Sequence, residues 1–130
     1  HPTRCSLAYW HHPLFSSGTH GNDPSMRALW GVLYEARVEI VVNGHDHDYE
    51  RFAPQSPTGQ PDEHGIREFV VGTGGHSNLR SFSLVQPNSE TRAAGMWGVL
   101  KLTLLTDRYQ WEFVVTAGSS FPDIGSGTCF

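Results

Sequence analysis

Two histidines lie two residues apart, at positions 45 and 47, directly after the short apolar run of residues 40–42. This β-branched run predicts a buried strand, and Gly44 predicts a turn at its end. If the backbone there is extended, His45 and His47 point to the same side and can reach one cavity. Imidazole is a common metal ligand, and two such rings can each bind one ion of a metal pair. Taken alone, the same spacing also fits a surface loop or a structural pair.

A second histidine group precedes the first. Residues 5–10 predict a strand that runs into His11-His12-Pro13, where Pro13 ends it. Strand, helix and strand within the first 43 residues predict a βαβ unit with parallel strands, whose carboxyl ends meet at one edge of the sheet. We therefore expect His11 beside the 45/47 pair, which favours a metal site over a surface loop.

The helix of this unit is predicted over residues 24–37. Asp23 followed by Pro24 is a start signal, and Arg37 near the end suits the helix dipole. Apolar residues at three- and four-residue steps predict one face buried in the core. That face comprises Met26, Leu29, Trp30, Leu33 and Tyr34.

Glycines follow the next predicted strand, residues 67–71. The sequence Gly72-Thr73-Gly74-Gly75-His76 permits close approach of the backbone to a ligand, and its amides could hold an anion. A plain turn is the alternative. Residues 53–65 are proline- and glycine-rich and predict a surface loop.

The last third of the chain predicts antiparallel strands. Residues 97–105 and 109–115 alternate apolar and polar side chains, which predicts a hairpin packed on a second layer. Residues 77–96 are expected to be irregular, and residues 117–130 an irregular tail. The predicted class is α/β, a βαβ unit followed by mostly antiparallel strands.

Composition narrows the classes of function. The 130 residues carry a formal charge of −4, with 38% hydrophobic residues, so we expect a folded domain and no basic surface for nucleic acid. No apolar run is long enough to span a membrane, and no signal peptide is seen. A chain that begins without Met just before a core strand is expected to be part of something longer. Cys5 and Cys129 could pair, which would favour export, or remain free thiols.

The motifs resemble a known family. Tyr9-Trp10-His11-His12-Pro13, followed by the stretch from Asn43 through Gly44-His45-Asp46-His47-Asp48-Tyr49-Glu50-Arg51, resembles the last two motif blocks of calcineurin-like metallophosphoesterases. The G-H-x-H-x-Y-E-R form is most similar to the purple acid phosphatase branch. The strand at residues 69–71 and the hairpin after it are also similar to that branch. The resemblance covers most of the chain, from Cys5 to about Val115.

This resemblance implies the C-terminal half of a four-layer α/β sandwich, with residues 1–130 as the C-terminal part of a single domain. It implies that His11 and His45 bind one metal and His47 the other, in a centre of two divalent or trivalent ions such as Fe, Zn or Mn. It places His20 in a loop that faces the phosphate, as a catalytic and substrate-binding residue. His12 and His76 are assigned to the substrate-binding set. The implied activity is hydrolysis of phosphate esters, and the implied location is extracellular.

The family's upstream motif blocks, which supply its carboxylate ligands, do not occur in this sequence. The resemblance therefore implies a partner, the missing N-terminal half of the same domain, besides the phosphate-ester substrate. The 130 residues alone are expected to bind metal weakly and to lack turnover. The alternative is a non-catalytic metal-binding or interaction module. A metallo-β-lactamase-like hydrolase is disfavoured, because that class usually shows H-x-H-x-D-H and here His47-Asp48 is followed by Tyr49.

Overall fold

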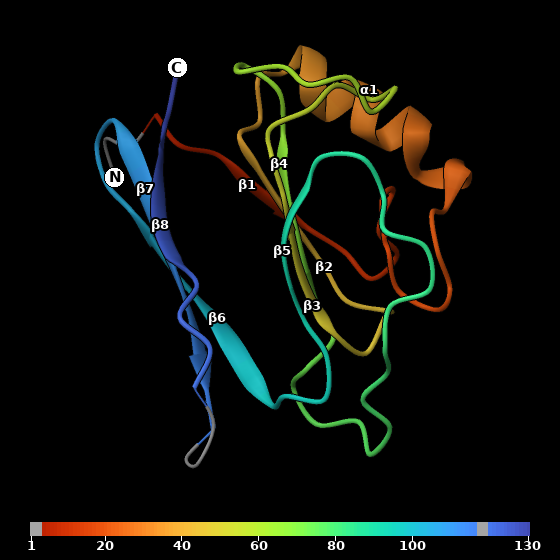
Figure 1. Cartoon of the computed structure of the whole chain (residues 1–130). Coiled ribbons are helices and arrows are strands. Elements are labelled where there is room, and N and C mark those ends of the chain that lie inside the picture. The colour runs from red at the N-terminus through yellow and green to blue at the C-terminus, as the bar shows by residue number, and fades with distance from the viewer. Residues whose placement is uncertain (1–3, 117–119) are drawn as a thin grey trace.

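The computed structural model describes residues 4–116 and 120–130, and it has a five-stranded mixed sheet (Figure 1). The strand order is β1-β2-β4-β3-β5. Strands β1, β2 and β4 are parallel, while β3 and β5 run antiparallel to their neighbours. Their bounds are Leu7–Tyr9 for β1, Ile40–Asn43 for β2, Tyr49–Phe52 for β3, Arg67–Val71 for β4 and Ser89–Ala93 for β5.

The predicted βαβ unit is confirmed. Strand β1 pairs with β2 in parallel, with Leu7 opposite Ile40. The connection is a 3-10 turn at Pro24–Met26 followed by α1 at Arg27–Glu35, shorter than the predicted helix. Asp23 caps the turn by accepting a hydrogen bond from the Ser25 amide, as its position predicted. The helix stops at Glu35 and does not reach residue 37, where Arg37 has a φ of 57° that ends regular helix.

A second, antiparallel sheet has the order β6-β7-β8. The hairpin of β6 (Gly98–Leu104) and β7 (Arg108–Val115) confirms the sequence prediction. Strand β8 (Ile124–Thr128) corrects the expected irregular tail, because its glycine- and serine-rich residues pair with residues 108–112 of β7. Residues 117–119 of that predicted tail lie outside the described residues.

Two further strands were not predicted. Strand β3 is formed by the end of the histidine motif, and β5 lies in the segment expected to be irregular. Both strands consist mainly of polar residues, so neither shows the apolar alternation that marks a strand. They pair with each other along one edge of the sheet, and together they bury the carboxylate of Glu50.

The first sheet lies between two layers, as Figure 1 shows: α1 covers one face and the second sheet the other. Alternate residues of each strand supply the two cores. Ile40 and Phe69 face the second sheet, whereas Val41 and Val70 face the side of α1, where Trp30 is fully buried. This arrangement of helix, mixed sheet and antiparallel sheet confirms the α/β class.

A disulfide joins the two ends of the described chain. Cys5 precedes β1 and Cys129 follows β8, and their Cα atoms lie 5.1 Å apart. The sequence had left free thiols as the alternative, and the structure selects the pair. Because the two residues are separated by 124 positions, the bond ties the second sheet to the start of the first.

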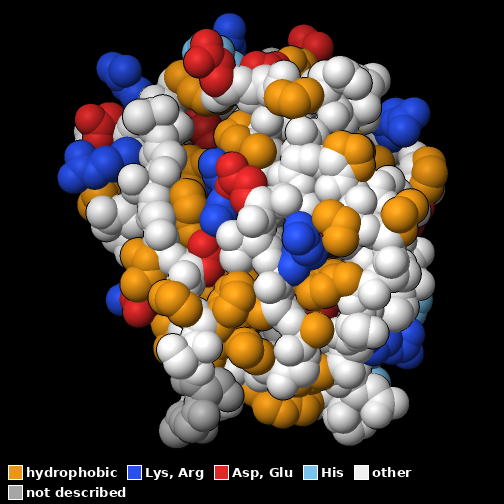
Figure 2. All heavy atoms as spheres, in the orientation of Figure 1, with side chains coloured by type: hydrophobic (Ala, Val, Ile, Leu, Met, Phe, Trp, Pro, Cys, Tyr) orange, Lys and Arg blue, Asp and Glu red, His pale blue; other side chains and the backbone are white. Residues whose placement is uncertain are grey.

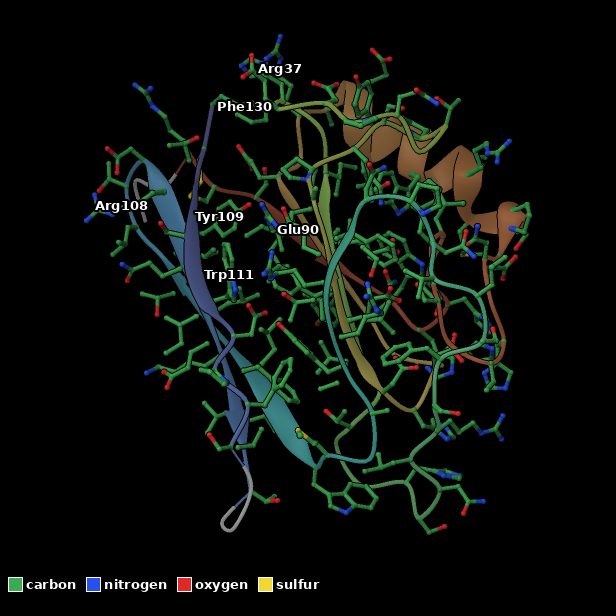
Figure 3. All side chains as sticks on the ribbon, in the orientation of Figure 1. Arg37, Glu90, Arg108, Tyr109, Trp111 and Phe130 are labelled. Carbon is green, nitrogen blue, oxygen red and sulfur yellow. A yellow bond between two sulfur atoms is a disulfide. The ribbon has the colours of Figure 1, made fainter. Side chains whose placement is uncertain are left out.

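A polar network crosses the space between the sheets. The guanidinium groups of Arg51 and Arg67 lie 4.8 and 4.9 Å from the ring centre of Trp111 on β7. Both groups also bind the carboxylate of Glu90, and Arg51 pairs with Asp123 at 2.9 Å. In Figure 3, Trp111 lies on the second sheet and Glu90 on the first, on either side of the space between the layers. The Arg51 of the motif is therefore a structural residue that links the sheets.

The outer edge of both sheets exposes apolar side chains. A groove of about 460 Å³ runs between β1 and β6 and is lined by Tyr9, Val42 and Val99 among others. Tyr9 is 80% exposed and Val99 is 59% exposed. Acidic, basic and hydrophobic side chains are interspersed on the face seen in Figure 2. Among the described residues, no helix has the length and apolar character needed to cross a membrane.

Candidate metal centre

Three imidazoles converge where β1 and β2 end. Ring nitrogens of His11, His12 and His45 all lie within 4.8 Å of one another. The shortest contact joins Nδ1 of His45 to Nε2 of His11, at 3.3 Å. Because β1 and β2 are parallel, their carboxyl ends bring these residues together although 34 positions separate His11 from His45. The expected closeness of His11 and His45 is confirmed, and His12 joins them.

Backbone hydrogen bonds lock the two loops that carry these rings. The amide of Gly44 donates to the carbonyl of His11 at 3.0 Å. The side-chain amide of Asn43 donates to the carbonyls of Trp10 and His12, at 3.0 and 3.4 Å. A Cβ at Gly44 would lie 3.6 Å from the His11 ring, so this position brings backbone against the imidazole. The loops are thereby held as one unit.

The backbone at His45 differs from the sequence expectation. Its φ is 65°, in the left-handed region that residues other than glycine rarely adopt. The segment through the histidine pair is therefore bent, not extended, and alternation along a strand does not govern where the two rings point. Strain of this kind persists where the surroundings enforce it, and it is frequent at functional sites. The His45 ring is directed by a turn toward His11.

His47 lies outside the cluster of three rings. Its Nδ1 is 3.0 Å from the carbonyl oxygen of Asn78, and its ring stacks on His76 with centroids 3.9 Å apart. The ring centroid of His20 is 6.4 Å away. The structure therefore places His47 and His76 together beside the cluster, and the assignment of His47 as a ligand stays a prediction.

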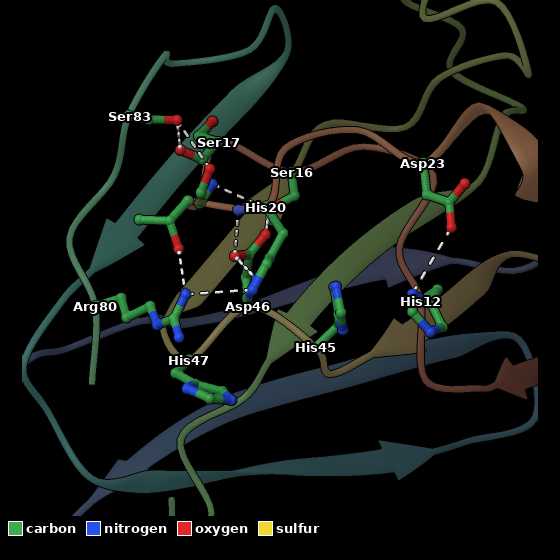
Figure 4. Close-up of polar contacts among 12 residues, drawn as sticks. His12, Ser16, Ser17, His20, Asp23, His45, Asp46, His47, Arg80 and Ser83 are labelled. Atoms are coloured by element: carbon green, nitrogen blue, oxygen red, sulfur yellow. Dashed lines mark hydrogen bonds and ion pairs between the residues drawn. The ribbon is translucent and has the colours of Figure 1, made fainter. Parts of the chain in front are cut away.

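His20 lies between the two groups, as Figure 4 shows. Its ring centroid is 4.3 Å from that of His45, and its Nδ1 is 2.8 Å from Oδ1 of Asp46. The backbone amide of His20 donates to the same oxygen at 3.0 Å. The side chain is 34% exposed, so one carboxylate fixes a ring that is still open to solvent.

Sequence reasoning missed Asp46, the residue between the two motif histidines. Its carboxylate is fully buried and also accepts a hydrogen bond from Oγ of Ser16 at 2.5 Å. A Cβ at Gly18 would lie 2.2 Å from its side chain, and one at Gly72 would overlap its carbonyl oxygen. The close approach permitted by Gly72 is thus to Asp46 and not to a ligand. The sequence feature that could have pointed to Asp46 is the alternation of acidic residues at positions 46, 48 and 50.

Buried acids hold the loop that carries His20. Glu68 on β4 accepts hydrogen bonds from the amides of Leu14 and Phe15, at 3.0 and 3.2 Å. Glu50 on β3 accepts one from the amide of Ser17 at 2.7 Å. With Asp46, these carboxylates fasten residues 14–20 across the end of the sheet. Buried carboxyl groups on the sheet therefore hold the loop in position.

Replacing Glu68 with glutamine should change how stability depends on pH. Burial raises the pKa of Glu68 well above its usual value of 4.5, so the folded chain keeps a proton that the unfolded chain releases. The free energy of unfolding therefore falls as the pH rises above that value. We expect Glu68→Gln, which cannot ionise, to become progressively more stable than the wild type as the pH rises, as measured by urea unfolding. The exposed Glu63→Gln is the control, and an identical pH slope in all three proteins would contradict the prediction.

Two other ionisable groups near the cluster are perturbed. Burial first, and then the neighbouring imidazoles, lower the pKa of His45, which favours the neutral, metal-binding form of the ring. Burial first, and then the nearby carboxylates of Asp46 and Glu50, raise the pKa of Asp48 to about 8. Among the described residues, neither oxygen of the Asp48 carboxylate has a hydrogen-bond partner.

The donor set of the cluster fits one metal ion. Three imidazoles are a known ligand set for a catalytic ion that keeps one position open. Imidazole suits both Fe and Zn, so the ligand type does not select between these two of the ions that the resemblance implies. Among the described residues, the cluster of His11, His12 and His45 includes no carboxylate, and a second ion would need donors beyond these three.

Comparisons with known proteins agree with this fold and these motifs. No family model matches the chain. The chain is 34% identical over 82 residues to purple acid phosphatase 21 of Arabidopsis thaliana, which is 61% of this chain and 18% of that protein. It is 36% identical over 70 residues to purple acid phosphatase 22 of the same plant, covering 53% of this chain and 16% of that protein. The chain thus spans less than a fifth of either relative.

Two solved structures share the fold. One is the purple acid phosphatase PPD1 from yellow lupin (Lupinus luteus) seeds, with a TM-score of 0.74, 22% identity, and coverage of 95% of this chain and 24% of that one. The other is GAP50, the anchor in the inner membrane complex of Plasmodium, with a TM-score of 0.75, 17% identity, and coverage of 98% of this chain and 37% of that one.

The chain resembles calcineurin-like domains in its fold and in its histidine motifs. Among these it is purple acid phosphatase-like, and the resemblance is to the C-terminal part of such a domain. The resemblance seen in the motifs is therefore confirmed. The α/β fold class inferred from it is confirmed as well.

Proposed function

We propose that the protein carrying this chain hydrolyses phosphate esters with the help of metal ions held by its histidines. The observation that carries this proposal is the convergence of His11, His12 and His45 within 4.8 Å, at the ends of parallel strands, in a purple acid phosphatase-like fold. Ion-binding rings at the carboxyl edge of an α/β sheet are in the usual position for such a site.

Each histidine has a proposed role. His11 and His45 would hold one ion, with His12 as a neighbouring donor, and His47 would contribute to a second ion on the side of His76. When bound, such ions neutralise charge on phosphoryl oxygens and acidify water. The proposed ions are Fe, Zn or Mn. His12 and His76 otherwise remain candidates for substrate contact.

His20 is the proposed general acid and phosphate contact. Asp46 binds its Nδ1 and its backbone amide, and its Nε2, which contacts Arg80 in this structure, is the nitrogen proposed to act on the substrate. A ring oriented in this way can donate a hydrogen bond to a phosphoryl oxygen or a proton to the leaving alkoxide. The geometry supports this role because the ring lies next to His45, and Asp46 keeps it there.

The apolar groove between β1 and β6 supports a further part of the proposal. Large apolar side chains that are exposed in one groove usually mark a contact surface. We therefore propose that the remainder of the same domain packs against this groove in the whole protein. That remainder would supply the carboxylate ligands. We also propose that the protein is exported, because a disulfide such as Cys5–Cys129 persists in oxidising compartments.

Metal removal tests the proposed activity. The whole protein is expected to hydrolyse p-nitrophenyl phosphate, to lose this activity on dialysis against a chelator, and to regain it with Zn²⁺, Mn²⁺ or iron. Activity that survives complete removal of metal, confirmed by elemental analysis, would contradict the proposal. So would a metal-loaded protein that hydrolyses no phosphate ester.

A second candidate function is a non-catalytic interaction module. The observation in its favour is the similarity in fold to GAP50, the anchor in the inner membrane complex of Plasmodium. This alternative predicts that metal binds without any phosphoesterase activity. The assay of the metal-loaded whole protein therefore separates the two candidates.

A further inference from the structure

Arg80 lies against the histidine site although it is distant in sequence. It belongs to the segment between β4 and β5 and is half-buried. Its Nη1 lies 3.2 Å from Nε2 of His20 and 3.3 Å from Oγ1 of Thr19, as Figure 4 shows for His20. Its backbone amide donates to the carbonyl of His47 at 3.0 Å. Arg80 is thus attached to two histidines of the site.

The contact with His20 orients its ring. A guanidinium group can only donate hydrogen bonds, so Arg80 is the donor where its Nη1 meets Nε2 of His20. On the other side of the ring, Nδ1 lies 2.8 Å from Oδ1 of Asp46. The His20 ring is thus held between a carboxylate and a guanidinium.

The charge of Arg80 is not neutralised by a protein carboxylate. Across residues 4–116 and 120–130, no acidic group lies within ion-pair distance of its guanidinium. Within the same residues, Thr19 and His20 are its side-chain partners, and both contact only Nη1. The other N–H groups of the guanidinium are therefore free of protein partners in the described structure. A guanidinium in this state is suited to bind an anion through two parallel hydrogen bonds.

We propose that Arg80 binds the phosphoryl group of the substrate and favours phosphate monoesters over diesters. This proposal rests on the proposed function, because it assigns the substrate class of the same site. A monoester carries up to two negative charges and three terminal oxygens, whereas a diester carries one charge and two such oxygens. A fixed cation beside His20 therefore stabilises the bound monoester more strongly.

The test compares Arg80→Gln with Arg80→Lys in the whole protein. Arg108→Gln is the matched control, because Arg108 is an exposed arginine on β7 whose side chain contacts Asp107. Binding of inorganic phosphate is measured by calorimetry, and kcat/KM is measured with p-nitrophenyl phosphate and bis(p-nitrophenyl) phosphate. Circular dichroism and metal content verify that each variant is folded and loaded.

Arg80→Gln should weaken phosphate binding about tenfold, which corresponds to about 1.4 kcal/mol. It should lower kcat/KM for the monoester by a similar factor and for the diester by less than about threefold, since the diester carries less charge. Arg80→Lys should fall between Arg80→Gln and the wild type, because lysine keeps the charge and lacks the planar fork. Arg108→Gln should match the wild type.

Several results would overturn the proposal. They are unchanged phosphate binding by Arg80→Gln, an equal loss for both esters, or a wild type that binds no phosphate. If the wild type hydrolyses neither ester, the proposed function fails, and calorimetry with phosphate still decides the role of Arg80. Failure of the two proposals can therefore be distinguished.

Discussion

The His45→Ala variant of the whole protein is expected to lose metal and phosphoesterase activity together. His45 contributes the ring that contacts His11 at 3.3 Å and lies closest to the centre of the imidazole cluster. Replacing residues that merely support a metal ligand costs about 10- to 100-fold, so removing a ligand should cost at least about 100-fold in metal affinity. Elemental analysis after dialysis and hydrolysis of p-nitrophenyl phosphate measure the two effects.

The matched control for this prediction is His64→Ala. His64 is a histidine with a side chain 58% exposed, near Glu63 and Phe130, and it has no place in the imidazole cluster. This variant should keep both its metal and its activity. The prediction is wrong if His45→Ala retains wild-type metal content and wild-type turnover.

Removing the disulfide is expected to have the largest effect on stability. The bond closes a loop across a sequence separation of 124 residues, which restricts the unfolded chain strongly. The chain-entropy relation gives roughly 4–5 kcal/mol for a loop of this size. The Cys5→Ala/Cys129→Ala variant should therefore unfold at a temperature lower by on the order of 10 °C. Alanine is preferred to serine because Cys5 is buried in the apolar core between the sheets.

Reduction of the wild type provides the internal control. A reducing agent should lower the unfolding temperature of the wild type to that of the double variant, and it should leave the variant unchanged. A double variant that unfolds at the wild-type temperature would show that the bond contributes little to stability.

The sequence predicted the elements whose apolar pattern is regular. The βαβ unit and the hairpin of β6 and β7 have clear periodicity, and the structure confirms both. Strands β3 and β5 were missed because charged and hydroxyl side chains interrupt their apolar pattern. Glu50, for example, is fully buried on β3 and binds Ser17 and Ser89. Strand β8 was missed because glycine and serine dominate it.

The site was predictable in part. Parallel strands place His11 beside His45 from topology alone, and this expectation is confirmed. The position of His47 was not predictable, because it depends on the left-handed turn at His45. Asp46 and Arg80 were also missed. Their importance comes from contacts with His20, which sequence spacing does not reveal.

The most direct test of the metal site is anomalous diffraction from crystals of the whole protein grown with Zn²⁺ or Mn²⁺. We predict an anomalous peak at roughly 2.0–2.2 Å from ring nitrogens of both His11 and His45, the usual distance for metal–imidazole bonds. A protein whose bound ion lies elsewhere, with these two rings free of metal, would contradict the account.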